Sequence, residues 1–145
     1  MPRITRTIIT EKPREAVFSY LADFSNATEW DPGTEQSTPR QSGGPMPGQV
    51  YDLVVTWGSR TLPMVYETTV LDPGERVTFV GDASTTRAID TLTFDDLPNG
   101  GTEVTYTADI TLKWPYRIVE PFLGRKFTEL GDEAETSLSS VLARL

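Results

Sequence analysis

The first candidate for chemistry is an acidic residue on an apolar strand face. Residues 86–97 alternate so that Ala88, Asp90, Leu92 and Phe94 share one side of an expected strand. A carboxylate on such a face is costly unless it has a partner. Asp90 is therefore either a ligand-anchoring or proton-accepting acid with a raised pKa, or a residue near the solvent-exposed end of its strand.

Aromatic side chains are the second candidates. Strand alternation and helical spacing turn seven of them toward the interior: Tyr51, Trp57, Tyr66, Phe79, Tyr106, Phe122 and Phe127. They form either an ordinary core or the lining of a cavity. A buried phenol needs a hydrogen-bond partner, which a ligand or trapped water supplies, so the three tyrosines favour a cavity.

Trp30 and two glycines have two interpretations each. Trp30 ends a short polar stretch after an expected helix, so it is either a plug for the core or a gate near a cavity rim. Gly124 and Gly131 lie seven residues apart on one line of an expected C-terminal helix, where each glycine costs about 1 kcal/mol relative to alanine. They permit either close packing on a sheet or room for a ligand.

Composition excludes several kinds of site. The 145 residues include no histidine and no cysteine, which rules out a Ser-His-Asp triad and thiolate chemistry. No phosphate-loop, dinucleotide or nucleophile-elbow motif is present, and the acidic residues lack metal-site spacing. A net charge of -8 argues against nucleic acid as a partner. We expect no metal and no cofactor, and any acid–base work falls to residues such as Asp, Tyr and Arg.

The helices and strands that must position these residues are predicted from the spacing of apolar residues and from the prolines and glycines that interrupt it. We expect a first strand at 3–10, a helix containing Val17 to Phe24 with Pro13 in its first turn, and a second short helix to Trp30 capped by Ser25. Six strands are expected at 34–42, 49–57, 61–72, 76–82, 86–97 and 102–114, the first of them an edge strand interrupted by Pro39. After Pro115 the period becomes helical, and Pro121 either kinks this last helix or marks its start. Hairpin turns make the sheet antiparallel, and the last helix is the only large element left to cover its apolar face, within a single domain of residues 1–145.

Four stretches carry a family resemblance. The segments EKPREAVFSYLADFSNATEW, LDPGERVTF and FDDLPNGGTEVTYTADI, with the amphipathic C-terminal helix, resemble the polyketide cyclase/dehydrase branch of the START-like (SRPBCC, Bet v 1-like) superfamily. The resemblance implies an α+β helix-grip fold, in which a seven-stranded antiparallel sheet grips the C-terminal helix around a hydrophobic cavity. In that fold the first and sixth strands flank the last one, so Arg6, between Ile4 and Ile8, is within reach of Asp90.

Binding and catalysis both remain open. The first hypothesis is a protein that binds a small hydrophobic or aromatic ligand, such as a lipid or polyketide, in its cavity. The expected ligand-binding residues are Trp30, Tyr51, Trp57, Tyr66, Phe79, Tyr106, Phe127, Leu130 and Gly131. The alternative is a polyketide cyclase or aromatase with Asp90, Tyr106 and Arg6 as candidate catalytic groups. A protein-interaction module is the third hypothesis, favoured if aromatic side chains fill the cavity.

The N-terminal residues contain no apolar core of a signal peptide, and no apolar run reaches the length of a membrane span. We therefore expect a cytoplasmic monomer or homodimer without stable membrane insertion.

Overall fold

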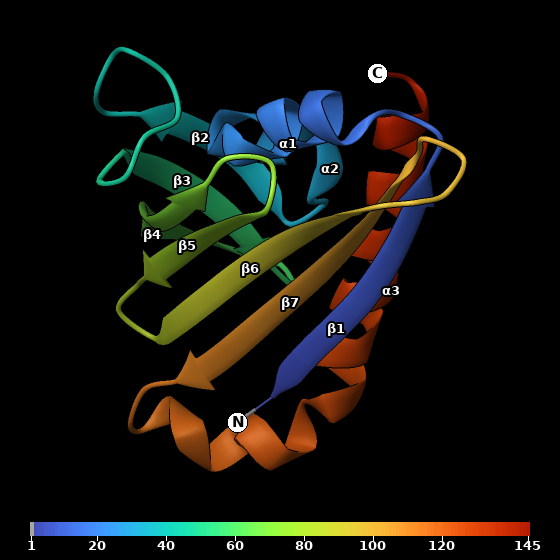
Figure 1. Ribbon diagram of the computed structural model, residues 1–145. Helices are drawn as coiled ribbons and strands as arrows, with labels where there is room; N and C mark the ends of the chain where they lie inside the picture. The colour runs from blue at the N-terminus through green and yellow to red at the C-terminus, as the bar shows by residue number, and fades with distance from the viewer. Residues whose placement is uncertain (1) are drawn as a thin grey trace.

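The computed structural model describes residues 2–145, which form one seven-stranded antiparallel sheet with helices on its concave side (Figure 1). The strands are β1 (Arg3–Thr10), β2 (Thr34–Pro39), β3 (Val50–Trp57), β4 (Arg60–Asp72), β5 (Arg76–Asp82), β6 (Thr86–Asp96) and β7 (Thr102–Leu112). Their spatial order is β1-β7-β6-β5-β4-β3-β2, and every neighbouring pair is antiparallel. The expected seven-stranded antiparallel sheet is confirmed, with β2 at one edge.

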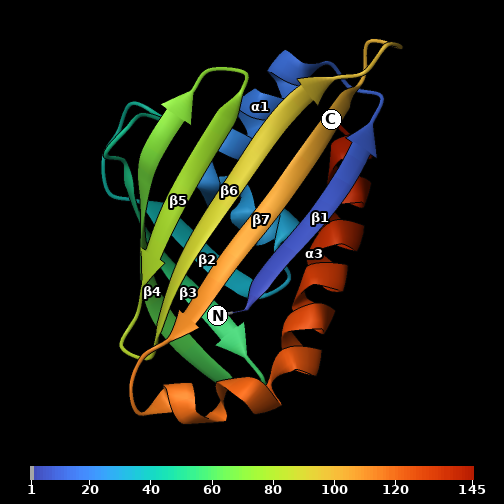
Figure 2. The same ribbon diagram turned by 60° about the horizontal axis from the view of Figure 1, so that its bottom comes forward.

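The helices lie between and after the strands as the sequence predicts. They are α1 (Arg14–Ala22), the 3₁₀ helix η1 (Phe24–Asn26), α2 (Ala27–Trp30), the 3₁₀ helix η2 (Tyr116–Phe122) and α3 (Gly124–Ala143). The short helix expected to run to Trp30 with Ser25 as its cap is divided into η1 and α2, and Ser25 caps neither. The Asp23 side chain caps η1 by accepting a hydrogen bond from the Ser25 backbone N–H, and Asn26 is the N-cap residue of α2. Figures 1 and 2 show α1 and η2 at opposite ends of the curved sheet, with α3 running alongside β1 between them. This is the helix-grip arrangement.

Gly131 sets how closely α3 approaches β1. A Cβ atom added at Gly131 would lie 2.5 Å from Cγ2 of Ile4 and 2.8 Å from a guanidinium nitrogen of Arg6. Gly124, at the start of the helix, has open space around the same position. Close packing on the sheet is therefore the role of Gly131 only.

Pro121 precedes the start of α3, and one prediction about this region is wrong. The side chain of Phe122, expected to point inward, is 83% exposed. The apolar stripe expected along the last helix includes residues that precede α3, and in the structure these residues form η2. A 3₁₀ helix has three residues per turn, so the α-helical phase does not carry across the junction.

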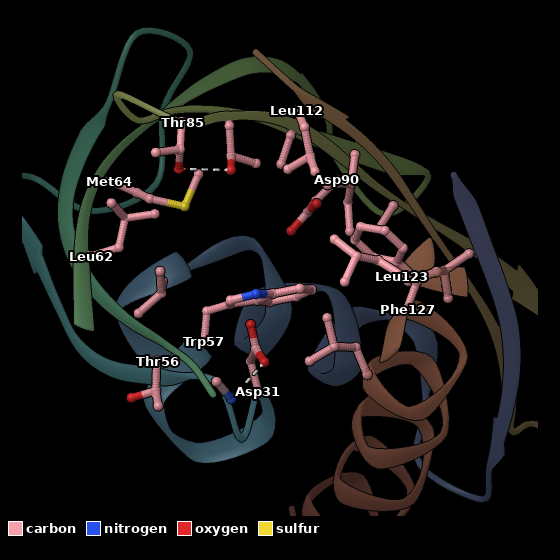
Figure 3. A pocket seen from close by; sticks show the side chains of 18 of the residues that line it. Asp31, Thr56, Trp57, Leu62, Met64, Thr85, Asp90, Leu112, Leu123 and Phe127 are labelled. Atoms are coloured by element: carbon pink, nitrogen blue, oxygen red, sulfur yellow. Dashed lines mark hydrogen bonds between the residues drawn. The ribbon is translucent and has the colours of Figure 1, made fainter. Parts of the chain in front are cut away.

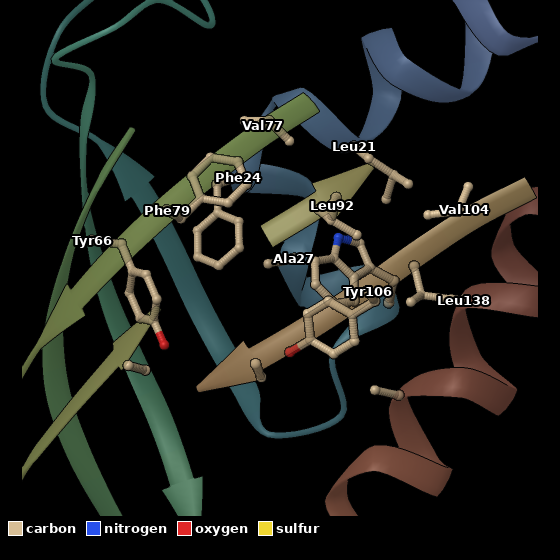
Figure 4. Packing of buried hydrophobic residues seen from close by; sticks show 14 of the residues in the cluster. Leu21, Phe24, Ala27, Tyr66, Val77, Phe79, Leu92, Val104, Tyr106 and Leu138 are labelled. Atoms are coloured by element: carbon tan, nitrogen blue, oxygen red, sulfur yellow. The ribbon is translucent and has the colours of Figure 1, made fainter. Parts of the chain in front are cut away.

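An aromatic core fills the end of the sheet beneath α1 and η1. Phe24 packs against Phe79, Tyr66 and Tyr51, with ring centroids 4.2, 4.9 and 5.9 Å apart. Figure 4 shows Phe24 and Phe79 beside Tyr66, with Leu92 and Leu138 completing the packing toward α3. Across residues 2–145, no helix combines the length and apolar character needed to cross a membrane.

Candidate functional site

A cavity of about 440 Å³ occupies the other part of the interior, between the concave face of the sheet and α3. Strands β3, β4, β6 and β7 form its wall on the sheet side, and residues from Leu123 to Ala134 close it on the helix side. The aromatic core borders it at Tyr66, which contacts Phe24 and also lines the cavity. Its volume lies within the usual range for small-molecule sites.

The structure brings six of the nine expected ligand-binding residues together around this cavity. Trp57, Tyr66, Tyr106, Phe127, Leu130 and Gly131 line it. The Trp57 and Phe127 rings also contact each other, with centroids 5.5 Å apart. Tyr51 and Phe79 belong to the aromatic core and are not among the lining residues.

Trp30 lies in the core and not at the cavity rim. Its side chain is completely buried and makes edge-to-face contacts with Phe24 and Tyr106, at centroid distances of 6.2 and 5.6 Å. The short helix α2 packs against both β2 and α3, which turns the indole inward. Trp30 therefore fills the core behind Tyr106, which is the plug interpretation and not the gate interpretation.

Asp90 is the central polar group of the cavity. It is 5% exposed, and its carboxyl makes no hydrogen bond or ion pair with any residue from 2 to 145. Figure 3 shows this carboxyl pointing from the sheet into the cavity. Burial, and then the nearby charges of Asp31 and Asp109, raise the pKa of Asp90 to about 8. The strand alternation predicted this placement correctly.

Two phenols share the space with Asp90. Tyr66 on β4 and Tyr106 on β7 are each 7% exposed, and Figure 4 shows their hydroxyls directed toward the space between them. Neither hydroxyl has a hydrogen-bond partner within the described part of the chain. Burial, followed by the charge of Asp90, raises the pKa of both phenols well above the usual value. Both remain neutral hydrogen-bond donors over the physiological range.

A second carboxyl, Asp31, reaches the cavity from the turn between α2 and β2 (Figure 3). It accepts hydrogen bonds from the Gly33 N–H and the Thr34 hydroxyl, each 3.0 Å long. Burial raises its pKa, while these two hydrogen bonds act in the opposite direction. The break containing Asp31 stands out in the sequence, but Trp30 was the residue expected to contact a ligand there. The Asp-Pro-Gly turn was the available signal.

Arg6 does not reach Asp90, so that expected pair is wrong. The Arg6 guanidinium lies against α3, 3.0 Å from an oxygen of Asp132 and 3.4 Å from one of Glu135, and is not among the cavity-lining residues. The strand order that prompted the prediction is correct. However, α3 covers β1 and offers Arg6 carboxylates in a more exposed setting than the cavity.

The cavity opens between the β3–β4 hairpin and η2. Its exposed lining residues are Arg60 and Thr61 on the hairpin and Tyr116 and Val119 on η2. Arg60 is the one basic residue of the lining, and it lies at this mouth. The mouth was not predictable from sequence because it depends on how two distant segments face each other.

The site combines a mostly apolar cavity with an acid, Asp90, that titrates near neutrality. Protonated Asp90 donates a hydrogen bond, and ionised Asp90 accepts hydrogen bonds or a proton. The neighbouring phenols donate as well. The interior carries carboxyls but no buried basic side chain among its lining residues, so it disfavours an anionic group.

Comparison with known proteins places this geometry in a family. A family model described as "Polyketide cyclase / dehydrase and lipid transport" matches residues 1–141. A search of curated proteins found no match.

Solved structures share the fold at low sequence identity. A START superfamily protein from Mycobacterium smegmatis superposes with a TM-score of 0.80 at 13% identity, covering 98% of this chain and 97% of that one. A protein from Thermus thermophilus gives 0.79 at 16% identity, with coverages of 99% and 98%. The Zhui aromatase/cyclase from a Streptomyces species gives 0.77 at 17% identity, with coverages of 99% and 94%. These structures share the helix-grip fold of this chain, and because the family model spans nearly the whole sequence, the chain belongs to the polyketide cyclase/dehydrase and lipid transport family.

Proposed function

We propose that the protein binds a small, mostly apolar ligand in the cavity, with a polar group of the ligand hydrogen-bonded to Asp90. One observation carries this proposal: a buried carboxyl without a protein partner among residues 2–145 faces a cavity of about 440 Å³. A ligand group that hydrogen-bonds to Asp90 supplies the partner that the described residues do not, and such a bond is stronger inside a low-dielectric cavity than in water. Apolar contacts with the rest of the lining supply the remaining affinity.

The charges of the lining predict which ligands bind best. Asp31 and Asp90 face the interior, and Arg60 is confined to the mouth. An amine at the inner end favours the ionised, accepting form of Asp90, and a hydroxyl bonds to Asp90 in either protonation state, whereas a carboxylate finds no basic partner there and opposes ionisation of both acids. We expect neutral or cationic ligands to bind more tightly than anionic ligands of the same shape.

Fluorescence titration with the neutral probe N-phenyl-1-naphthylamine tests binding. Ala108 lines the cavity directly across from Asp90 in the β6–β7 register, and Thr107 precedes it on the opposite face of β7. Ala108→Phe fills the cavity and is expected to weaken probe binding about tenfold or more. Thr107→Phe is the matched control and leaves affinity unchanged. Equal affinity in both variants, or no probe binding by the wild type, would contradict the proposal.

Competition with three naphthalenes tests the polar contact. Naphthylmethylamine, naphthylmethanol and naphthoate differ mainly in the group presented to the acids. We expect naphthoate to compete least well and Asp90→Asn to reduce the difference between the three. Extraction of the purified protein, followed by mass spectrometry, then identifies any ligand carried from the cell.

A second candidate function is cyclisation of a poly-β-ketone chain. The raised pKa of Asp90, about 8, favours it, because an acid that titrates near neutrality exchanges protons readily. The family description and the aromatase/cyclase among the structural neighbours support the same candidate. Ionised Asp90 would remove a proton from a carbon between two carbonyls, and that carbon would attack a further carbonyl of the chain. Asp90 would return the proton to the resulting alkoxide, and loss of water would follow.

Incubation with a synthetic tetraketide thioester separates the two candidates. Catalysis predicts a product lighter by one water, formed by the wild type and lost in Asp90→Asn while the probe still binds. An unchanged thioester under conditions where it displaces the probe would leave binding as the function.

A further inference from the structure

Exposed apolar side chains concentrate in one short segment beside the cavity. Residues 114–122, named here the mouth segment, contain five of the eight large hydrophobic residues that are exposed within residues 2–145: Trp114, Tyr116, Ile118, Val119 and Phe122. Trp114 is 75% exposed and Phe122 is 83% exposed. The segment spans η2, the orange helix between β7 and α3 in Figures 1 and 2. Such a cluster on a surface marks an interaction site.

The charge around the mouth segment is opposite to that of the whole protein. Residues 113–126 include Lys113, Arg117, Arg125 and Lys126 but only one acidic residue, in a chain with a net charge of -8. Arg117 forms no ion pair with any residue from 2 to 145, whereas Lys113 pairs with Asp82 and Arg125, whose side chain is 94% exposed, pairs with Glu129 at 3.7 Å. These four basic residues, named here the basic fringe, surround exposed aromatic and aliphatic side chains. This combination of charge and apolar surface matches an anionic lipid surface.

The same segment borders the opening of the cavity. Tyr116 and Val119 are exposed and also line the cavity, facing Arg60 and Thr61 of the β3–β4 hairpin. A surface in contact with the mouth segment would therefore also cover the entrance.

We propose that the mouth segment docks the protein peripherally on an anionic lipid bilayer, with the cavity entrance turned toward the membrane. Trp114 and Tyr116 place amphipathic rings at headgroup level, and Phe122 and Ile118 reach the acyl boundary. Arg117, Arg125 and Lys126 contact the headgroup phosphates. The docking surface does not depend on what the cavity holds.

A second copy of the chain fits the mouth segment less well than lipid does. A twofold dimer brings the same patch of both subunits together, so the basic fringe would face itself. Like charges placed opposite each other oppose association.

Vesicle sedimentation tests the proposal. We expect wild-type protein to bind vesicles of phosphatidylcholine mixed equally with phosphatidylglycerol, and to bind pure phosphatidylcholine much more weakly. Trp114→Ser combined with Phe122→Ser should lower the partition coefficient about tenfold or more. Arg117→Gln should lower it about fivefold on anionic vesicles, with a weaker effect at high salt.

Ile9 provides the matched control. It is 64% exposed on β1 and pairs with Glu103, at the end of the sheet away from η2 (Figure 1). Ile9→Ser should bind vesicles as the wild type does, and thermal unfolding should show all variants folded. Quenching of tryptophan fluorescence by brominated lipid should fall strongly in Trp114→Phe, because Trp30 is buried and Trp57 is partly buried against Phe127.

Three results would overturn the proposal. They are absence of wild-type binding to anionic vesicles, equal binding by the double variant, and equal loss of binding in Ile9→Ser. Light scattering that shows a dimer dissociated by the double variant would assign the mouth segment to self-association instead.

Discussion

Gly81 lies directly opposite Tyr66 in the β4–β5 register, and the Tyr66 ring covers the position that a Cβ of residue 81 would occupy. The atoms of the phenol nearest to that position lie closer than van der Waals contact permits. A glycine at position 81, one residue before the end of β5, is thus the condition for Tyr66 to lie flat across the neighbouring strand. The ring orientation in turn aims the hydroxyl at the cavity (Figure 4).

Gly81→Ala is expected to displace the Tyr66 ring. Overpacking of this kind costs about 1–3 kcal/mol in unfolding free energy. In a Tyr66→Ala background the same substitution should cost at least about 1 kcal/mol less, because the overlap is gone. Urea denaturation of the four proteins measures the difference. An identical cost in both backgrounds would show that the close contact is not what requires glycine.

Asp90 makes stability fall as pH rises. Its folded-state pKa of about 8 lies above its ordinary value of 3.8, so between these values the native state retains a proton that the unfolded state has lost. Unfolding then releases a proton, and the free energy of unfolding decreases by up to about 1.4 kcal/mol per pH unit. The loss of unfolding free energy due to Asp90 is absent below about pH 4, grows through neutrality and is complete above about pH 8. Asp90→Asn should remove it and stabilise the protein at pH 8 by several kcal/mol.

Urea denaturation between pH 5 and pH 9 checks this. The groups that act on Asp90 are Asp31 from the α2–β2 turn, Tyr66 from β4, and Tyr106 and Asp109 from β7. Asp31 also has a raised pKa and adds to the same trend, so the difference between wild type and Asp90→Asn isolates the contribution of Asp90. A difference that does not grow with pH would contradict the assignment.

Trp30→Ala is expected to act on stability and not on access to the cavity. Removing a fully buried tryptophan costs about 3–5 kcal/mol, and Tyr106 loses the ring packed against it. Trp30→Phe retains most of the packing and should cost less. Stopped-flow dissociation of N-phenyl-1-naphthylamine from Trp30→Phe measures exchange in a folded protein. A large acceleration in that variant would restore the gate interpretation.

Local patterns predicted the parts of the site that depend on one strand. The alternation of β6 determines that Asp90 shares a face with Leu92 and Phe94, whatever the rest of the chain does. The hairpin turns likewise predicted the antiparallel order. The same logic placed Tyr66 and Tyr106 on the concave face.

Features that depend on how separate elements dock were not predictable in this way. Arg6 pairs with Asp132 because α3 lies over β1, and nothing local to β1 encodes that position. Trp30 is a plug because α2 packs inward, although its sequence context suits a rim equally well. Phe122 is exposed and not part of the apolar stripe of α3, because it lies in a 3₁₀ helix that does not continue the α-helical period.

The two glycines of α3 offer a paired test of how the helix grips the sheet. Gly131→Ala would place a methyl group 2.5 Å from Cγ2 of Ile4, so α3 must move away from β1, at a cost of about 1–3 kcal/mol. Gly124→Ala meets no atom within 4 Å and replaces a poor helix former, so it should be neutral or stabilise the protein by up to about 1 kcal/mol. Thermal and urea unfolding of both variants measure the contrast. Because Gly131 also lines the cavity, its variant should bind N-phenyl-1-naphthylamine differently while Gly124→Ala binds it as the wild type does. Equal effects of the two substitutions would show that helix propensity, and not the close approach of α3 to β1, decides the outcome.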